Sequence, residues 1–288
     1  MPAGRRSPGW PSAASHVVGV IGDPVGHSLS PLLHNAAFDA LGLDWVSVGF
    51  PVAAGGVPDA FAGIRALGIV GLSVTMPHKQ AAAVAVDECT PLARRLGAVN
   101  CVVRDGDRLV GDSTDGPGFV AALRRGAGFD PAGARCVVLG AGGAARAVIA
   151  ALADAGAASV VVVNRTRASA EEAALLAGEA GTVGEAAAIE EAALLVQATP
   201  VGMALGAETD GQLPVDEALL HEGLVVADLV VHPLRTPLLA AAEARGARPV
   251  NGLGMLVHQA ALALERWTGR PAPVEAMWAA AAAAGHSE

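Results

Sequence analysis

One lysine and one aspartate have the side chains needed to move a proton to or from a small molecule. Lys79, the sole lysine of this 288-residue chain, follows directly on a predicted strand over residues 69–74 and the segment TMPH. Asp115 lies in the polar run GDSTDG, residues 111–116. Burial of the amine would favour its neutral form and a nearby carboxylate its charged form, and the sequence leaves that balance open. Each residue also has a structural explanation, Lys79 as a solvated residue opening a helix and Asp115 as a helix cap.

Two serines near the N-terminus point to an anion site. Ser28 and Ser30 stand just ahead of a predicted helix that extends through Leu41. Hydroxyls beside a helix N-terminus can hold a small carboxylate without a cation. Ser30 followed by Pro31 also has the pattern of an N-cap and a first helical residue, which is its structural explanation. Ser28 has no such alternative, so it is the stronger candidate.

Two amide side chains fall in otherwise apolar surroundings. Asn100 lies in a predicted strand over residues 98–104, and its buried amide needs partners, either a loop carbonyl or a substrate hydroxyl. Gln259 follows Met255 by four residues on one face of a predicted helix that reaches Trp267. Met255 alone would pass for a core residue. We expect this helix to return to the first half of the chain.

The stretch from Cys136 to Arg165 has the layout of a dinucleotide-binding βαβ unit. An apolar run meets the turn GAGGAA (residues 140–145), an alanine-rich helical pattern follows, and a second strand is predicted at 160–163. Gly140 permits the tight turn, Gly142 lets the backbone approach a pyrophosphate, and Ala145 keeps helix and strand close. The N–H groups that open the helix would face the phosphates.

The residues after the second strand favour NADP over NAD. An acidic residue there would accept hydrogen bonds from the ribose of NAD, whereas this chain has Asn164 and Arg165. A cation at this position suits the additional phosphate of NADP.

Further strands at 194–197 and 224–229 alternate with helices, which predicts a parallel, doubly wound sheet.

Composition excludes several classes of protein. The net charge of −9 argues against nucleic-acid binding. Mean hydropathy is +0.46 and 52% of residues are hydrophobic, yet no apolar run approaches the roughly 18 residues of a membrane span. Three scattered cysteines favour reduced thiols and a cytoplasmic location. Residues 1–16 lack the pattern of a signal peptide and are interpreted as a disordered tail. Histidines without ligand spacing predict no metal site.

Eight ordered motifs resemble those of shikimate dehydrogenases over residues 17 to about 270. They are GDPVGHSLSP, SVTMPHK, GAVN, GDSTDG, GAGGAAR, NRT, ATPVGM and NGLGMLVHQA. The resemblance implies an α/β chain of two domains with a cleft between them. A substrate-binding catalytic domain would comprise residues 17–116 and 250–288, and a Rossmann-type NADP-binding domain residues 117–249. The implied reaction is the reversible reduction of 3-dehydroshikimate to shikimate in aromatic amino acid biosynthesis.

The resemblance also implies a role for each matching residue. Lys79 and Asp115 would be the catalytic pair. Ser28 and Ser30 would hold the substrate carboxylate, and three residues would contact the ring hydroxyls: Thr75, Asn100 and Gln259. The residues expected to contact the cofactor are Gly140, Ala141, Gly142, Gly143, Ala144, Asn164, Arg165, Thr166, Arg167, Thr199, Met203, Gly252 and Met255.

This chain departs from the family pattern at four positions. Ser73 and Gln197 stand where asparagine is usual, and Ser169 where a second basic residue often follows the NRT motif. Val231 occupies the place of a usual tyrosine, and the chain has no tyrosine at all. The missing phenol leaves affinity or substrate choice open to change.

Alternative functions share most of these motifs. A quinate/shikimate dehydrogenase or an amino-shikimate dehydrogenase, using NAD, is the nearest. A non-catalytic dinucleotide sensor would keep the glycine turn and could lose Lys79 or Asp115, yet both are present. The expected partners are small molecules, with no nucleic acid and no membrane, and a homodimer is left open.

Overall fold

The computed structural model describes residues 11–203 and 212–286, which fall into two compact units. Unit 1 contains the described residues up to Thr114 and those from Val257 onward, and unit 2 extends from Asp115 to Leu256. The chain therefore leaves unit 1 within the GDSTDG run and returns to it inside a helix. Of the expected N-terminal tail, residues 1–10 lie outside the described residues, and a strand already begins at His16.

Unit 1 is built on a mixed six-stranded sheet with the order β2-β1-β3-β5-β6-β4. Strands β2, β1 and β3 are parallel, as are β4 and β6, whereas β5 is antiparallel to both β3 and β6. The strands are β1 (His16–Gly22), β2 (Trp45–Pro51), β3 (Gly71–Val74), β4 (Glu88–Cys89), β5 (Cys101–Asp105) and β6 (Arg108–Asp112). Because β5 begins at Cys101, the prediction that Asn100 lies inside a strand is wrong, and Asn100 ends the preceding loop instead.

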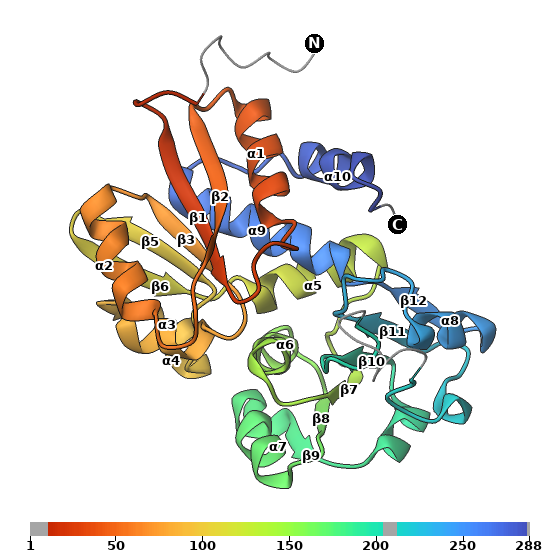
Figure 1. Ribbon diagram of the computed structural model, residues 1–288. Coiled ribbons are helices and arrows are strands. Elements are labelled where there is room, and N and C mark those ends of the chain that lie inside the picture. The colour runs from red at the N-terminus through yellow and green to blue at the C-terminus, as the bar shows by residue number, and fades with distance from the viewer. Residues whose placement is uncertain (1–10, 204–211, 287–288) are drawn as a thin grey trace. The chain divides into compact units, whose positions relative to one another are not determined.

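Helices cover both faces of this sheet (Figure 1). One face packs under α2 (Val57–Leu67), α3 (Lys79–Ala85) and α4 (Pro91–Leu96), in a core that includes Phe61, Leu72 and Val102. The other face carries α1 (Ser30–Leu41) and α9 (Leu253–Thr268), with α10 (Val274–Ala283) against α1. Pro31 in the first turn favours the start of α1, and Gly42, at φ +65°, ends it in the left-handed conformation.

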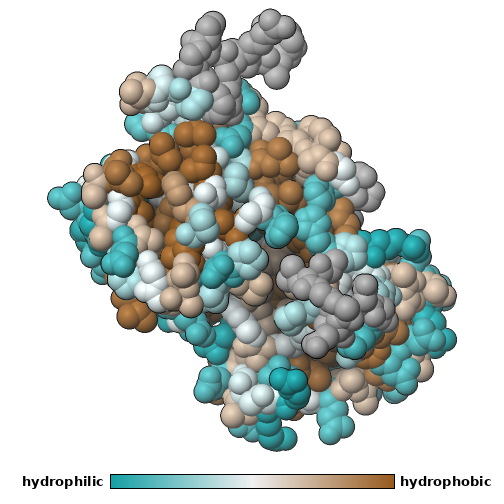
Figure 2. Space-filling view, in the orientation of Figure 1, coloured by the Kyte–Doolittle hydropathy of each residue, from teal (hydrophilic) through white to brown (hydrophobic). Residues whose placement is uncertain are grey.

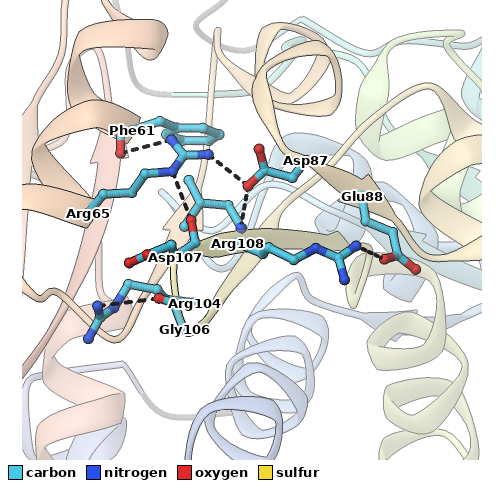
Figure 3. A network of polar contacts seen from close by, with 9 residues as sticks. Phe61, Arg65, Asp87, Glu88, Arg104, Gly106, Asp107 and Arg108 are labelled. Atoms are coloured by element: carbon cyan, nitrogen blue, oxygen red, sulfur yellow. Dashed lines mark hydrogen bonds and ion pairs between the residues drawn. The ribbon is translucent and has the colours of Figure 1, made fainter.

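A polar network fastens the β5–β6 hairpin to its neighbours (Figure 3). Arg65 on α2 donates to the Asp87 carboxylate at 2.7 Å and to the carbonyl of Asp107 at 3.1 Å. The backbone N–H of Leu109 also donates to Asp87, at 2.6 Å. These bonds, the one from Leu109 first, lower the pKa of the exposed Asp87 carboxyl. The hairpin that begins just after Asn100 is thus held at its turn.

Unit 2 has a parallel six-stranded sheet with the order β12-β11-β10-β7-β8-β9. Its strands are β7 (Arg135–Leu139), β8 (Ser159–Val163), β9 (Gly181–Val183), β10 (Leu194–Gln197), β11 (Val225–Asp228) and β12 (Arg248–Val250). This is the dinucleotide-fold order, with its topological switch between β7 and β10. The predicted doubly wound sheet is confirmed.

Both faces of the unit 2 sheet are buried, which explains why its strands are continuous apolar runs. The helices α5 (Asp115–Gly126), α6 (Gly143–Asp154) and α7 (Arg167–Ala174) pack on one face with Val138, Val160 and Val196. The other face packs with α8 (Pro237–Ala244) and two 3₁₀ turns, η2 (Ala186–Glu191) and η3 (Glu217–Leu219); Ile189 of η2 and Leu220, just after η3, are buried there.

Apolar residues gather on the part of the surface shown in Figure 2 that belongs to unit 1, interspersed with hydrophilic ones. The most exposed large apolar side chains among the described residues include Val84 and Leu67. Within the described ranges, no helix combines the length and hydrophobicity that crossing a membrane would require.

Candidate active site

Three polar side chains meet in the interior of unit 1. The amide of Asn100 donates to the Thr114 hydroxyl at 2.9 Å and to Gln259 Oε1 at 3.3 Å, and its Oδ1 accepts from the backbone N–H of Thr114 at 2.7 Å. These contacts fix the orientation of the Asn100 amide. All three residues are buried, with exposed fractions of 8% or less. The structure thus joins two predicted substrate contacts that are 159 residues apart in the chain.

Lys79 lies next to this cluster through the backbone. It is the first residue of α3, and its carbonyl accepts a hydrogen bond from the N–H of Val99 at 2.9 Å, one residue before Asn100. The preceding His78 is buried and contacts the carbonyl of Val52 at 2.6 Å through Nε2. This contact fixes the turn that presents Lys79, whose side chain is half-buried.

Thr75 lies where the ends of β1 and β3 run together. Its N–H donates to the carbonyl of Ile21 at 2.9 Å, and Asp23 donates to the carbonyl of Met76 at 3.0 Å. A β-carbon at Gly22 would come within 2.4 Å of the Thr75 side chain, so the close approach requires glycine there. The segment that carries Ser28 therefore starts beside the half-buried Thr75.

The structural roles of the two serines differ from those expected. The N-cap of α1 is Leu29, which makes no side-chain cap bond, and Ser30 is already the first helical residue. Ser28 instead accepts a hydrogen bond from the N–H of Ser30 at 3.3 Å. Ser28 precedes the helix, so its hydroxyl can reach the N–H groups that the helix leaves unpaired. The expectation that Ser28 lacks a structural role is wrong, and Ser30 is a buried helical residue.

Asp115 opens unit 2 as the first residue of α5, and its side chain is buried. It follows Thr114 directly, so the two hydrogen bonds between Thr114 and Asn100 fix the backbone just before Asp115. A carboxylate in the first turn of a helix is stabilised by the helix dipole. That effect agrees with the structural explanation of Asp115 and does not conflict with a chemical role.

The glycine turn of unit 2 has the geometry that the sequence predicts. Gly140 adopts φ +108°, which L side chains rarely adopt, and its N–H donates to the carbonyl of Val163 at 2.8 Å. Gly142 is the N-cap of α6, where no side chain caps the helix. A β-carbon at Gly142 would meet nothing within 4 Å, so the space beside this helix start is open. Ala145 is fully buried, as close packing of helix and strand requires.

The residues after β8 form a short polar loop. The Asn164 amide donates to the carbonyl of Thr166 at 3.0 Å, and Thr166 is the N-cap of α7. Arg167 pairs with Glu171 at 2.9 Å on the exposed face of that helix. Arg165 is exposed and has no ion pair with any residue in the described part of the chain. Its guanidinium is therefore the better placed of the two to receive an anionic ligand.

The ends of β10 and β11 carry buried polar side chains in register. Gln197 is fully buried and donates to the Thr199 hydroxyl at 2.9 Å and to the carbonyl of Val201 at 3.0 Å, which shapes the segment leading to Met203. Its partner in register, Asp228, accepts from Thr236 at 2.7 Å. Burial raises the pKa of the Asp228 carboxyl to about 6, although its hydrogen bonds act in the opposite direction.

Gly252 and Met255 follow β12. A β-carbon at Gly252 would lie 2.6 Å from the carbonyl oxygen of Leu229, so no larger residue fits beside the end of β11. Met255 is half-buried in the first turn of α9 and packs against the unit 2 core. Gln259, one turn further along the same helix, belongs to unit 1.

Sequence reasoning missed the polar residues that hold the Asn100 cluster. None of Thr114, Asp112 and Arg266 was placed at the site from the sequence. Arg266 follows Gln259 by seven residues, a spacing that returns to nearly the same helical face and could have drawn notice. Within residues 11–203 and 212–286, no cluster of three or more His, Cys, Asp or Glu side chains could hold a metal ion.

Comparison with known proteins covers most of the chain. Residues 20–102 match the shikimate dehydrogenase substrate binding domain, residues 124–204 the shikimate / quinate 5-dehydrogenase family and residues 252–282 the shikimate 5'-dehydrogenase C-terminal domain. A shikimate dehydrogenase (NADP(+)) from Methanopyrus kandleri is 48% identical over 275 residues, which span 92% of this chain and 94% of that protein.

Solved structures of shikimate and quinate dehydrogenases are similar to this chain over most of its length. Shikimate 5-dehydrogenase from Thermus thermophilus, in complex with NADP(H) and shikimate, superimposes with a TM-score of 0.87 at 38% identity, covering 93% of this chain and 99% of that one. Quinate dehydrogenase from Corynebacterium glutamicum, in complex with NAD, gives a TM-score of 0.84 at 31% identity, covering 93% and 99%. The chain therefore belongs to the shikimate dehydrogenase family.

Proposed function

We propose that this protein catalyses the reversible, NADP-linked reduction of 3-dehydroshikimate to shikimate. The observation that carries the proposal is the meeting of the Asn100 and Gln259 amides beside the backbone of Lys79 within unit 1. Such a site offers amide groups to a polyhydroxylated ring and one amine to move a proton. The 48% identity to an NADP-dependent relative supports the same reaction.

Unit 1 would be the substrate-binding domain and unit 2 the dinucleotide-binding domain. We assign the substrate carboxylate to the hydroxyls of Ser28 and Ser30, close to the start of α1. The bond from the N–H of Ser30 to Ser28 Oγ uses one of the acceptor lone pairs and leaves the Ser28 proton free to donate to a carboxylate. Thr75, Asn100 and Gln259 would contact the ring hydroxyls.

The protein must orient the ketone and handle one proton, and NADPH, when bound, supplies the hydride. We assign the proton to Lys79. In the reducing direction its ammonium donates a proton to the oxygen of the former ketone, and in the oxidising direction its amine accepts one. Asp115 would accept a hydrogen bond from a substrate hydroxyl.

The residues of unit 2 fit a dinucleotide phosphate. The open space at Gly142 and the uncapped start of α6 suit the pyrophosphate, which would contact the turn from Gly140 to Ala144. Arg165 would pair with the additional phosphate of NADP, supported by Asn164, Thr166 and Arg167. Four further residues would line the nicotinamide end: Thr199, Met203, Gly252 and Met255.

Initial rates with four substrate–cofactor pairs test the proposal: shikimate or quinate with NADP or NAD. We expect the highest kcat/KM for shikimate with NADP. The highest kcat/KM for quinate with NAD would contradict the proposed function and identify a quinate dehydrogenase. Absence of turnover with all four pairs, together with measurable NADP binding, would favour the non-catalytic sensor.

We further propose a cytoplasmic location, which the absence of a disulfide among Cys89, Cys101 and Cys136 supports. A homodimer stays a prediction, and light scattering of the purified chain measures it.

A further inference from the structure

A buried carboxylate in unit 1 anchors helix α9 and belongs to none of the groups assigned above. Asp112, the last residue of β6, accepts from Arg266 Nε on α9 with Oδ2 at 2.7 Å. Its Oδ1 accepts from the Thr90 hydroxyl at 2.7 Å and from the N–H of Ser113 at 2.8 Å. The Asp112 side chain is 7% exposed, whereas that of Arg266 is 57% exposed. A buried carboxylate requires such donors, so this pair is a fixed feature of the unit.

The ion pair and the amide cluster form one closed ring of contacts. Arg266 lies seven residues after Gln259 on α9, about 10 Å along the axis and on nearly the same face. Asp112 lies two residues before Thr114, which binds Asn100, which in turn contacts Gln259. The helix and the end of the β5–β6 hairpin are therefore joined at two points two turns apart.

Two joints of this kind restrict the helix more than either does alone. With a contact at Gln259 alone, α9 could rotate about its axis or slide along it. Either movement would displace the Gln259 amide from Asn100. Trp267 adds a bond from its indole N–H to the carbonyl of Val102 at 3.0 Å, on the neighbouring face of the helix. The Trp267 bond fixes how closely α9 approaches the sheet, and the ion pair with Asp112 fixes its rotation.

We propose that Arg266 is a positioning residue for substrate binding: through Asp112 it fixes the rotation of α9 and holds the Gln259 amide against Asn100, in the orientation that a ring hydroxyl requires. This inference rests on the proposed function, because it gives Gln259 its role. It predicts that loss of the ion pair weakens substrate binding without changing the chemical step.

Steady-state kinetics with shikimate and NADP on four variants test the proposal. Arg266→Met should raise KM for shikimate roughly 3–10-fold, about the worth of one neutral hydrogen bond, and leave kcat and KM for NADP within about twofold. Arg266→Lys retains a cation and should restore most of the affinity. Gln259→Ala should raise KM to a similar extent. Arg270→Met is the matched control, because Arg270 follows the same helix and its guanidinium donates to the carbonyl of Leu41 instead of to Asp112.

The double variant Gln259→Ala/Arg266→Met distinguishes positioning from general destabilisation. If Arg266 acts through Gln259, the double variant should have about the KM of Gln259→Ala alone. Increases that multiply would overturn the proposal, as would an unchanged KM in Arg266→Met or an equal rise in Arg270→Met. Should Arg266→Met fail to fold, Asp112→Asn/Arg266→Met removes the unpaired carboxylate and should fold with the same raised KM.

A measurement without substrate separates this inference from the proposed function. Urea unfolding of Arg266→Met, Gln259→Ala and the double variant gives the coupling of the two residues in free energy of unfolding. If the wild type oxidises no shikimate, the proposed function is wrong. In that case, changes in free energy of unfolding that do not add in the double variant would still support the coupling of Arg266 to Gln259. Changes that add would overturn that coupling too.

Discussion

His34 on α1 should make unit 1 lose stability in mild acid. Its side chain is fully buried, contacts the Ser47 hydroxyl at 3.2 Å through Nδ1 and packs edge-on against Trp267. Burial lowers the pKa of the His34 imidazole from 6.5 to about 3, and a hydrogen bond to the backbone of Ala260 offsets part of that effect. The native state therefore excludes a proton that the unfolded state binds below pH 6.5.

The expected loss follows from this difference in pKa. A depressed native pKa contributes stability that is complete above the unfolded pKa and disappears as the pH falls toward the native value. At pH 5 the unfolded imidazole is almost fully protonated, which costs the native state about 2 kcal/mol relative to pH 7.5. The full difference of about 5 kcal/mol would appear only near pH 3.

Urea unfolding of wild type and His34→Leu between pH 7.5 and pH 5 measures this loss. Three tryptophans (Trp45, Trp267 and Trp278) lie in unit 1 and none lies in unit 2, so tryptophan fluorescence reports the unfolding of unit 1. As the pH falls from 7.5 to 5, the unfolding free energy of wild type should decrease by about 2 kcal/mol more than that of His34→Leu. A difference independent of pH would refute the reasoning, because other titrating groups cancel in the comparison.

Three further changes test unit 2 and the edge of the unit 1 sheet. Arg165→Ala should reduce the preference for NADP over NAD by about 10–100-fold in kcat/KM, the worth of a charge-assisted hydrogen bond, whereas Arg235→Ala, which removes an exposed arginine paired with Glu243, should not. The raised pKa of Asp228, about 6, means that native protein holds a proton that the unfolded chain releases near pH 3.8. The stability of wild type relative to Asp228→Asn, measured by urea unfolding followed by circular dichroism, should therefore fall as the pH rises from 4 to 6, because other titrating groups cancel in that difference. Asn35 bonds both the N–H and the carbonyl of Ser47 at 2.9 Å on edge strand β2, so Asn35→Ala should cost about 1–3 kcal/mol in urea unfolding.

The sequence was a good guide wherever the cause of structure is local. The φ of Gly140 and the buried strands of unit 2 depend on a few neighbouring residues or on periodicity. Thr90 shows the limit of such reasoning: it caps α4 by accepting from the N–H of Ala93, and the same hydroxyl donates to the distant Asp112. At the start of α1 the pattern Ser30-Pro31 predicts Ser30 as the N-cap, whereas Leu29 is the N-cap and Ser28 accepts a hydrogen bond from the N–H of Ser30.

Long-range pairings were beyond the sequence. Arg266 and Asp112 are separated by 154 residues, and nothing near either residue indicates its partner. The same holds for the contact of Asn100 with Gln259, since the family motifs predicted that both bind substrate but not that they bind each other. Such contacts depend on how the sheet and α9 pack, which periodicity does not determine.

The kinetics of Lys79→Ala test the central claim most directly, since Lys79 is the group assigned to proton transfer. Loss of a positioned acid–base group typically costs about 10²–10⁴-fold. With circular dichroism confirming that the variant is folded, kcat for shikimate oxidation with NADP should fall by that factor while KM changes little. Asp115→Asn should lower kcat as well and raise KM. A folded Lys79→Ala enzyme with near-normal kcat would remove Lys79 from the mechanism and contradict the account.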